Sequence, residues 1–114
     1  MKKQYNRKKS ELYFHIQPEN LNCAQAILKG FQKEFNVTEN DIEAYRAWGG
    51  GRAPEGICGA LFSANRLLNQ VGKPSITKDF NTKVSEINCS KIKAIHFPCL
   101  KCIEIADELL ERMK

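Results

Sequence analysis

The chain has 114 residues, of which 42% are hydrophobic and 27% are charged, which is the composition of an ordinary globular domain. A chain of this length can bury its own core as one domain, and no apolar run reaches the roughly 18–20 residues that cross a bilayer, so the sequence argues against a membrane protein. The net charge of +5 arises within the first ten residues while the rest of the chain is balanced, so nucleic-acid binding is not predicted either.

The N-terminal segment, residues 1–17, is predicted to form a mobile basic arm ahead of a cysteine-containing helical domain over residues 18–114. Within this arm, the apolar stretch 12–16 could pack onto the core. The basic residues of the arm are Lys2, Lys3, Arg7, Lys8 and Lys9. No apolar stretch follows them directly, so we expect no secretory signal and place the protein in a reducing cytoplasm.

Beyond the arm, apolar residues recur at helical spacing in five segments. Asn20 or Asn22 can cap the first of these helices and Asn36 can end it, while Thr38 with Asp41 resembles a cap for the second. The predicted helices cover residues 20–35, 39–48, 54–71, 76–87 and 98–113.

The breaks between these helices support the same assignment. Gly49, Gly50 and Gly51 end the second helix, and Pro54 suits the first position of the third. Residues 89–96 form a connector that could contain a short helix. No segment shows the period-2 alternation of a strand. The sequence therefore predicts an all-α fold, a single-domain bundle of about five helices with a mobile N-terminal arm.

Five cysteines in so short a chain are its most informative feature. Cys99 and Cys102 form a C-x-x-C pair directly after Pro98, which places both sulfurs on one face at the start of a helix. The unsatisfied N–H groups there carry partial positive charge, which predicts a lowered thiol pKa. The alternative is that both cysteines are small hydrophobic residues on the apolar stripe of that helix.

The other cysteines have comparable positions. Cys58 lies about one turn into its helix, just after the glycine-rich loop, and Cys23 lies in the first turn of the first helix. If these helix N-termini gather at one end of the bundle, Cys23, Cys58 and Cys99 converge with Cys102. Four converging thiolates are the ligands of a tetrahedral zinc ion or an iron–sulfur cluster. Cys89 is a fifth participant, a resolving thiol or a bystander.

Three further features near these thiols are candidate supporting groups. The glycines of residues 49–51 either end a helix or leave backbone N–H groups free to hold an anion. Arg52 either stabilises a thiolate or anionic substrate, or is solvated. His96 could act as a base or a ligand, although a lone histidine in a connector is more often structural.

Three stretches of the chain, NCAQAIL from Asn22, GGGRAPEGICGAL from Gly49 and CLKC from Cys99, resemble a family of small proteins named for a C…GCAxxG…C…C cysteine pattern. The resemblance covers about residues 20–112, and the glycine-rich block before Cys58 is its most specific part. It implies a small helical cytoplasmic domain of prokaryotic type that is redox-active through four cysteines, without naming a reaction.

Carried over to this chain, the four family positions resemble Cys23, Cys58, Cys89 and Cys102, which leaves Cys99 as an additional cysteine. Ser63 stands where the pattern has a glycine five residues after the central cysteine, and the local order is Cys58, Gly59, Ala60.

Three functions are open at this stage. The first is a small redox protein, a candidate thiol-dependent oxidoreductase that uses thiol–disulfide exchange or electron transfer, in which Cys58 or Cys99 attacks and Cys102 resolves. The second is an iron–sulfur or zinc protein with Cys23, Cys58, Cys99 and either Cys102 or Cys89 as ligands. The third is a non-catalytic interaction module with buried cysteines. The sequence names neither the redox partner protein nor the oligomeric state.

Overall fold

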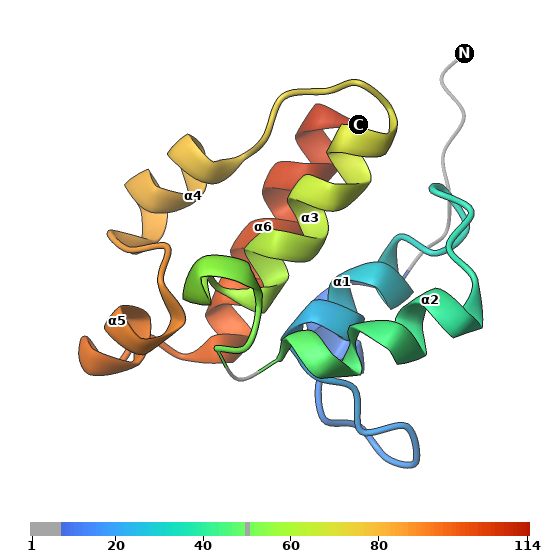
Figure 1. Cartoon of the computed structure of the whole chain (residues 1–114), viewed down its shortest axis with the longest axis horizontal. Coiled ribbons are helices and arrows are strands. Elements are labelled where there is room, and N and C mark those ends of the chain that lie inside the picture. Colours follow the sequence, from blue (N-terminus) through green and yellow to red (C-terminus); the bar gives the residue numbers. More distant parts are fainter. Residues whose placement is uncertain (1–7, 50) are drawn as a thin grey trace.

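The computed structural model describes residues 8–49 and 51–114, and this part of the chain is all-α, as predicted (Figure 1). The α-helices are α1 Cys23–Gly30, α2 Glu39–Ala44, α3 Gly59–Gln70, α4 Thr77–Val84, α5 Cys89–Ala94 and α6 Cys99–Met113. The short 3-10 helices are η1 Ser10–Tyr13, η2 Tyr45–Trp48 and η3 Pro54–Gly56. Within the described residues, none of these helices has the length and apolar character needed to cross a bilayer.

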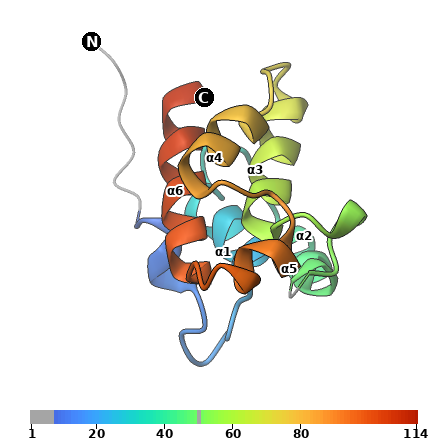
Figure 2. The same ribbon diagram turned by 90° about the vertical axis from the view of Figure 1, so that its left-hand side faces the viewer.

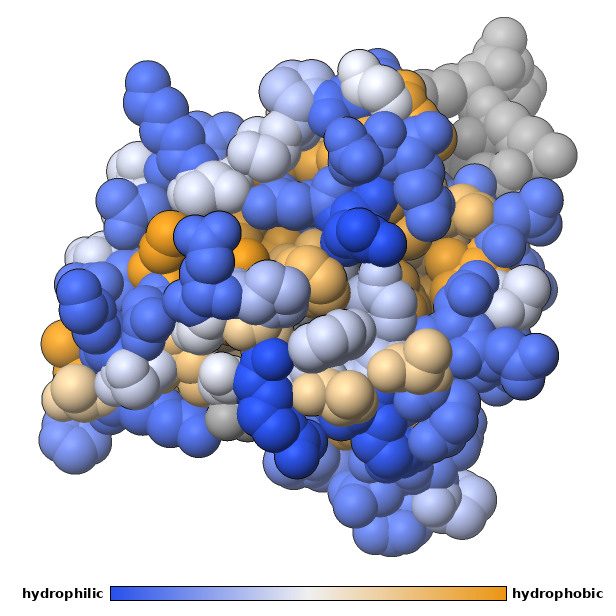
Figure 3. All heavy atoms as spheres, in the orientation of Figure 1, coloured by the Kyte–Doolittle hydropathy of each residue, from blue (hydrophilic) through white to orange (hydrophobic). Residues whose placement is uncertain are grey.

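The two longest helices, α3 and α6, form the centre of the fold and start at the same end of the molecule (Figures 1 and 2). Helix α1 packs against both of them, and α4 covers α6. Leu61 and Leu67 of α3 and Ile103 and Leu110 of α6 all belong to the fully buried core. The face shown in Figure 3 is largely hydrophilic, with hydrophobic side chains visible in smaller areas between the polar ones.

Helices α1 and α3 pack extensively against each other and are joined by a buried serine. Small residues on both helices, Ala24 and Ala60 among them, are fully buried and let the backbones approach. The Ser63 hydroxyl, also fully buried, donates a hydrogen bond to the Ala24 carbonyl oxygen at 2.8 Å. A hydroxyl in a well-packed interface is tolerated when it is hydrogen-bonded. The serine therefore links the two helices at the position where the family pattern has glycine.

The start of α3 differs from the sequence prediction, which placed it at Pro54. Pro54 instead begins η3, because Glu55 and Gly56 adopt left-handed backbone conformations with φ of 62° and 71°. Such residues cannot continue an α-helix. The Cys58 N–H then donates to the Ile87 carbonyl oxygen at 2.8 Å. Cys58 is consequently the residue just before α3, rather than one turn inside it.

Other helix ends also differ from the predicted ranges. Helix α1 ends at Gly30 rather than residue 35, although Phe31 is still fully buried and Asn36 turns the chain with φ of 57°. The second predicted helix divides into α2 and η2, and the connector after Asn88 contains α5. The predicted caps at Asn22 and at Thr38 with Asp41 are confirmed, each as a reciprocal capping box.

Part of the predicted N-terminal arm belongs to the globule. Ser10 is fully buried, and its backbone N–H donates to Asp107 of α6 at 2.8 Å. Tyr13 and Phe14 pack against the core, as expected for the apolar stretch 12–16. The packed region therefore begins ahead of the predicted boundary after residue 17. The first seven residues of the predicted arm lie outside the described part of the chain.

Candidate functional site

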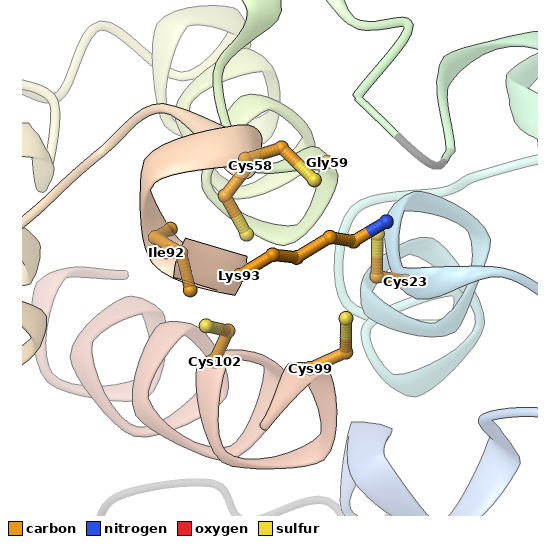
Figure 4. A pocket seen from close by; sticks show the side chains of 8 residues that line it. Cys23, Cys58, Gly59, Ile92, Lys93, Cys99 and Cys102 are labelled. Atoms are coloured by element: carbon orange, nitrogen blue, oxygen red, sulfur yellow. The ribbon is translucent and has the colours of Figure 1, made fainter. Parts of the chain in front are cut away.

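Four helices present a cysteine at their N-terminus. Cys23, Cys89 and Cys99 are the first residues of α1, α5 and α6, and Cys58 directly precedes α3. Cys102 lies one turn into α6. All five line a single small pocket, together with Gly59, Ile92 and Lys93 (Figure 4). The sequence left open whether these helix N-termini gather, and in the structure the five cysteines line the same pocket.

Local capping fixes the position of Cys23. The Asn22 side-chain oxygen accepts a hydrogen bond from the Gln25 N–H at 2.8 Å, and the Gln25 side chain accepts one from the Asn22 N–H at 3.0 Å. The buried Gln25 amide also donates to the Ile42 carbonyl oxygen at 2.8 Å. The cap therefore holds α1 against the α2 region and directs Cys23 toward the pocket.

Cys58 and Cys89 are held by contacts between neighbouring segments. The Cys58 N–H bonds to Ile87, and the next residue, Asn88, caps α5 by accepting hydrogen bonds from the N–H groups of Ser90 and Lys91 at 3.0 and 3.4 Å. The start of α3 and the start of α5 are therefore fixed relative to each other, although 31 positions separate Cys58 from Cys89 in the numbering of the chain.

Gly59 allows the start of α3 to lie directly against α1. A Cβ atom at this position would lie 2.7 Å from the Cys23 Sγ atom and 3.1 Å from the Trp48 carbonyl oxygen. Both distances are shorter than ordinary contacts. The glycine after Cys58 is therefore required by the packing around the cysteine pocket.

None of the five cysteines forms a disulfide, and their thiols differ in how deeply they are buried. Cys58 and Cys102 are both buried, with 5% and 2% of their surface exposed, and the Cys102 side chain lies close enough to raise the pKa of the Cys58 thiol. Cys23 is also buried, whereas Cys89 and Cys99 are partly exposed. We call Cys58 and Cys102 the inner pair. A reagent from solvent can meet Cys99 or Cys89 before it reaches the inner pair.

The predicted lowering of the thiol pKa by the helix N-terminus is wrong for Cys99. Burial raises the pKa of Cys99, and the neighbouring thiols of Cys89 and Cys58 raise it further. The charge of Lys93 and the N–H of Cys99 act in the opposite direction without reversing the shift. The hydrogen bond to Cys102, followed by burial, raises the pKa of Cys58 well above its ordinary value.

The raised pKa of Cys99 predicts slow alkylation near neutral pH. Because only the thiolate reacts, the rate of Cys99 modification by iodoacetamide should rise about tenfold per pH unit between about pH 7 and about pH 9, without reaching a plateau. Mass spectrometry of the modified peptide at short times measures this rate. A plateau below about pH 8 would show a lowered pKa and contradict the assignment.

Lys93 is the one charged residue among the described residues that line the cysteine pocket. Its side chain extends across the pocket in Figure 4, above Cys99 and Cys102, which project from α6. Sequence analysis missed this residue, because residues 89–96 gave only a weak helix signal and no sign of which side chain would face the cysteines.

The predicted supporting residues lie around the pocket rather than in it. The Arg52 guanidinium donates to the carbonyl oxygens of Gly49 at 2.9 Å and Arg46 at 3.3 Å, which closes the loop. Gly51 has φ of 85° and lies beside Cys89, while Gly50 is outside the described residues. His96 is exposed and follows α5 in a left-handed conformation with φ of 59°.

The geometry of the described residues does not add support to the metal alternative. Among residues 8–49 and 51–114, no three or more histidine, cysteine or acidic side chains are grouped so that they could hold one metal ion. Zinc or iron–sulfur ligation by Cys23, Cys58, Cys89, Cys99 and Cys102 stays a prediction of the sequence, without added support from this arrangement.

Comparisons of the chain with family models, with curated proteins and with solved structures found no match. The resemblance to the C…GCAxxG…C…C family therefore stays a prediction, and the functional interpretation depends on the geometry of the cysteine pocket.

Proposed function

We propose that the protein is a small cytoplasmic redox protein that works by thiol–disulfide exchange at the cysteine pocket. The observation that carries the proposal is the buried inner pair, Cys58 and Cys102, which lines one pocket with the partly exposed Cys99. Cys99 is accessible and lies one helical turn from Cys102, which in turn shares the buried interior with Cys58. This order suits stepwise transfer of a disulfide from a substrate to the inner pair.

The reaction begins at Cys99. Its thiol loses a proton to solvent, and the thiolate attacks one sulfur of a substrate disulfide; the substrate S–S bond breaks, and the departing half takes up a proton. Cys102 then loses its proton and attacks the Cys99 sulfur of the mixed disulfide, which releases the second substrate thiol. At this point Cys99 and Cys102 share a disulfide.

The inner pair completes the transfer. Cys58 loses its proton and attacks the sulfur of Cys102, so that Cys99 returns to the thiol form and a Cys58–Cys102 disulfide remains. In total the substrate disulfide gains two electrons and two protons, and the inner pair loses them. A dithiol reductant returns the inner pair to the reduced state by the reverse chemistry.

A trapping experiment tests the role of Cys102. With one equivalent of the chromogenic reagent 5,5′-dithiobis(2-nitrobenzoate), the reduced wild type should release about two equivalents of coloured thiolate and keep no adduct. Cys102→Ala should release about one equivalent and retain the aromatic adduct on Cys99, because the resolving thiol is missing. Absorbance gives the released thiolate, and peptide mass spectrometry locates the adduct.

A second cysteine variant controls for the loss of a thiol as such. Cys23→Ala removes a buried cysteine that takes no step in the proposed route, so it should release about two equivalents like the wild type. Complete release of both equivalents by Cys102→Ala, or an adduct on another cysteine, would show that Cys102 does not resolve a Cys99 intermediate.

A further inference from the structure

The cysteine pocket has room for a sulfur atom and little else. Its volume is about 20 Å³, close to the roughly 10–15 Å³ that one water molecule requires. Any substrate disulfide that reaches Cys99 must therefore keep most of its atoms outside this pocket. The surface next to the pocket is where those atoms have to lie.

A larger cleft of about 260 Å³ adjoins the cysteine pocket and shares Cys89 and Lys93 with it. Two glycines with left-handed backbone, Gly51 and Gly56, form part of its wall. A Cβ atom at Gly51 would lie 3.6 Å from the Cys89 Sγ atom, and one at Gly56 would lie 3.0 Å from the Asn88 amide nitrogen. The absence of these side chains keeps the cleft open.

The polar groups of the cleft favour an anion. Lys93 has no carboxylate within ion-pair distance among the described residues, and no acidic side chain is among the described residues that line the cleft. Toward the described residues, the Asn88 side-chain amide donates one hydrogen bond, a long one of 3.5 Å to the Glu55 carbonyl oxygen. The Ser90 hydroxyl donates to the Asn88 side-chain oxygen at 2.7 Å and so orients that amide. A carboxylate in this cleft would meet one ammonium and one amide donor.

We propose that this cleft binds the carboxylate-bearing part of a low-molecular-weight disulfide, with Lys93 as the partner of the carboxylate, while one sulfur of the ligand enters the cysteine pocket. The inference rests on the proposed function, because it assigns the substrate class of the same site. The volume suits a group of amino-acid size, with the carboxylate a few bonds from the sulfur. An acidic protein disulfide is the competing source of such a group.

Exchange kinetics with three small disulfides test the charge preference. The reduced protein is mixed with the anionic 3,3′-dithiodipropionate, the neutral bis(2-hydroxyethyl) disulfide or the cationic cystamine. The exchange rate with each disulfide is then divided by the exchange rate of 2-mercaptoethanol with the same disulfide. The wild type should favour the anionic substrate over the neutral one. Lys93→Met should lower this ratio roughly threefold to fivefold, and Lys93→Arg should largely retain it.

The ratio is the informative quantity because Lys93 also lowers the pKa of Cys99, so that its loss slows exchange with every disulfide. Lys83→Met is the matched control, since Lys83 is an exposed lysine on α4 that lines neither the cysteine pocket nor the cleft. It should leave the anionic-to-neutral ratio unchanged.

A binding measurement separates the cleft from the redox chemistry. The thioether 3,3′-thiodipropionate carries the same carboxylates but cannot exchange, and it should shift the NMR signals of the Asn88 side-chain amide in the wild type and in Lys83→Met, but not in Lys93→Met. If this shift occurs while no disulfide reacts, the proposed function fails and the cleft assignment stands. Equal normalised rates for the three small disulfides would overturn the assignment of a small carboxylate-bearing disulfide as substrate, while leaving thiol exchange in place. The same conclusion would follow if a preference for negative charge appeared only when an acidic protein disulfide replaced the small ones.

Discussion

Oxidation of the inner pair is expected to raise the free energy of unfolding by about 4 kcal/mol. A Cys58–Cys102 disulfide closes a loop of roughly 44 residues, and the loss of unfolded-state entropy for a loop of that size corresponds to this gain. For a chain of this length the melting temperature should rise by roughly 15 °C. Urea unfolding of the reduced and the oxidised protein, followed by circular dichroism, measures the difference.

The increase in the free energy of unfolding also distinguishes the Cys58–Cys102 disulfide from the Cys99–Cys102 disulfide of the proposed route. A Cys99–Cys102 disulfide closes a loop of roughly three residues and should contribute less than about 2 kcal/mol. Cys58→Ala can form only this shorter loop from the residues of the route, so its oxidised form should show the smaller gain. If oxidation raises the free energy of unfolding of the wild type by less than about 2 kcal/mol, Cys58 does not take part in the final disulfide.

Gly59→Ala is expected to destabilise the fold by about 2–3 kcal/mol. The new Cβ would lie 2.7 Å from the Cys23 Sγ atom and 3.1 Å from the Trp48 carbonyl oxygen, so α3 must move away from α1 at the point where the cysteines meet. Overpacking of a tight interface typically costs this amount. Thermal or urea unfolding of the reduced protein gives the free-energy difference.

A double-mutant cycle identifies the contact responsible for this loss. Cys23→Ala removes the sulfur nearest to the new methyl group, so Gly59→Ala should cost less in the Cys23→Ala background than in the wild type. The rescue should be partial, because the Trp48 carbonyl oxygen and the Ala24 Cβ atom, at 3.1 and 3.3 Å, still crowd the methyl group. An unchanged cost in both backgrounds would mean that the Cys23 sulfur does not limit the approach of the helices.

Local sequence signals were sufficient to place most of the site. Asn22 caps α1 through its own side chain, and Pro98 precedes α6, so the positions of Cys23 and Cys99 at helix N-termini follow from a few neighbouring residues. The apolar spacing within each helix likewise predicts which faces meet in the core. The all-α fold was therefore accessible from the sequence, whereas the gathering of the cysteines followed only on the condition that the helix N-termini meet at one end of the bundle.

Features that depend on distant contacts were not accessible in this way. The start of α3 was misplaced because the hydrogen bond from Cys58 to Ile87 and the left-handed Glu55 leave no clear local signal. The direction of the Cys99 pKa shift was wrong because burial depends on how α5 covers the pocket. Lys93 was missed for the same reason, since only the packed fold shows which face of α5 meets the cysteines.

The most direct test of thiol–disulfide exchange at this site is to locate the disulfide after one round of substrate reduction. Reduced protein is reacted with one equivalent of a small disulfide, the remaining thiols are alkylated, and the peptides are mapped by mass spectrometry. We expect the free-thiol count to fall by about two and a linked peptide pair to join Cys58 to Cys102. An unchanged thiol count, or a stable disulfide that excludes both residues of the inner pair, would contradict the account.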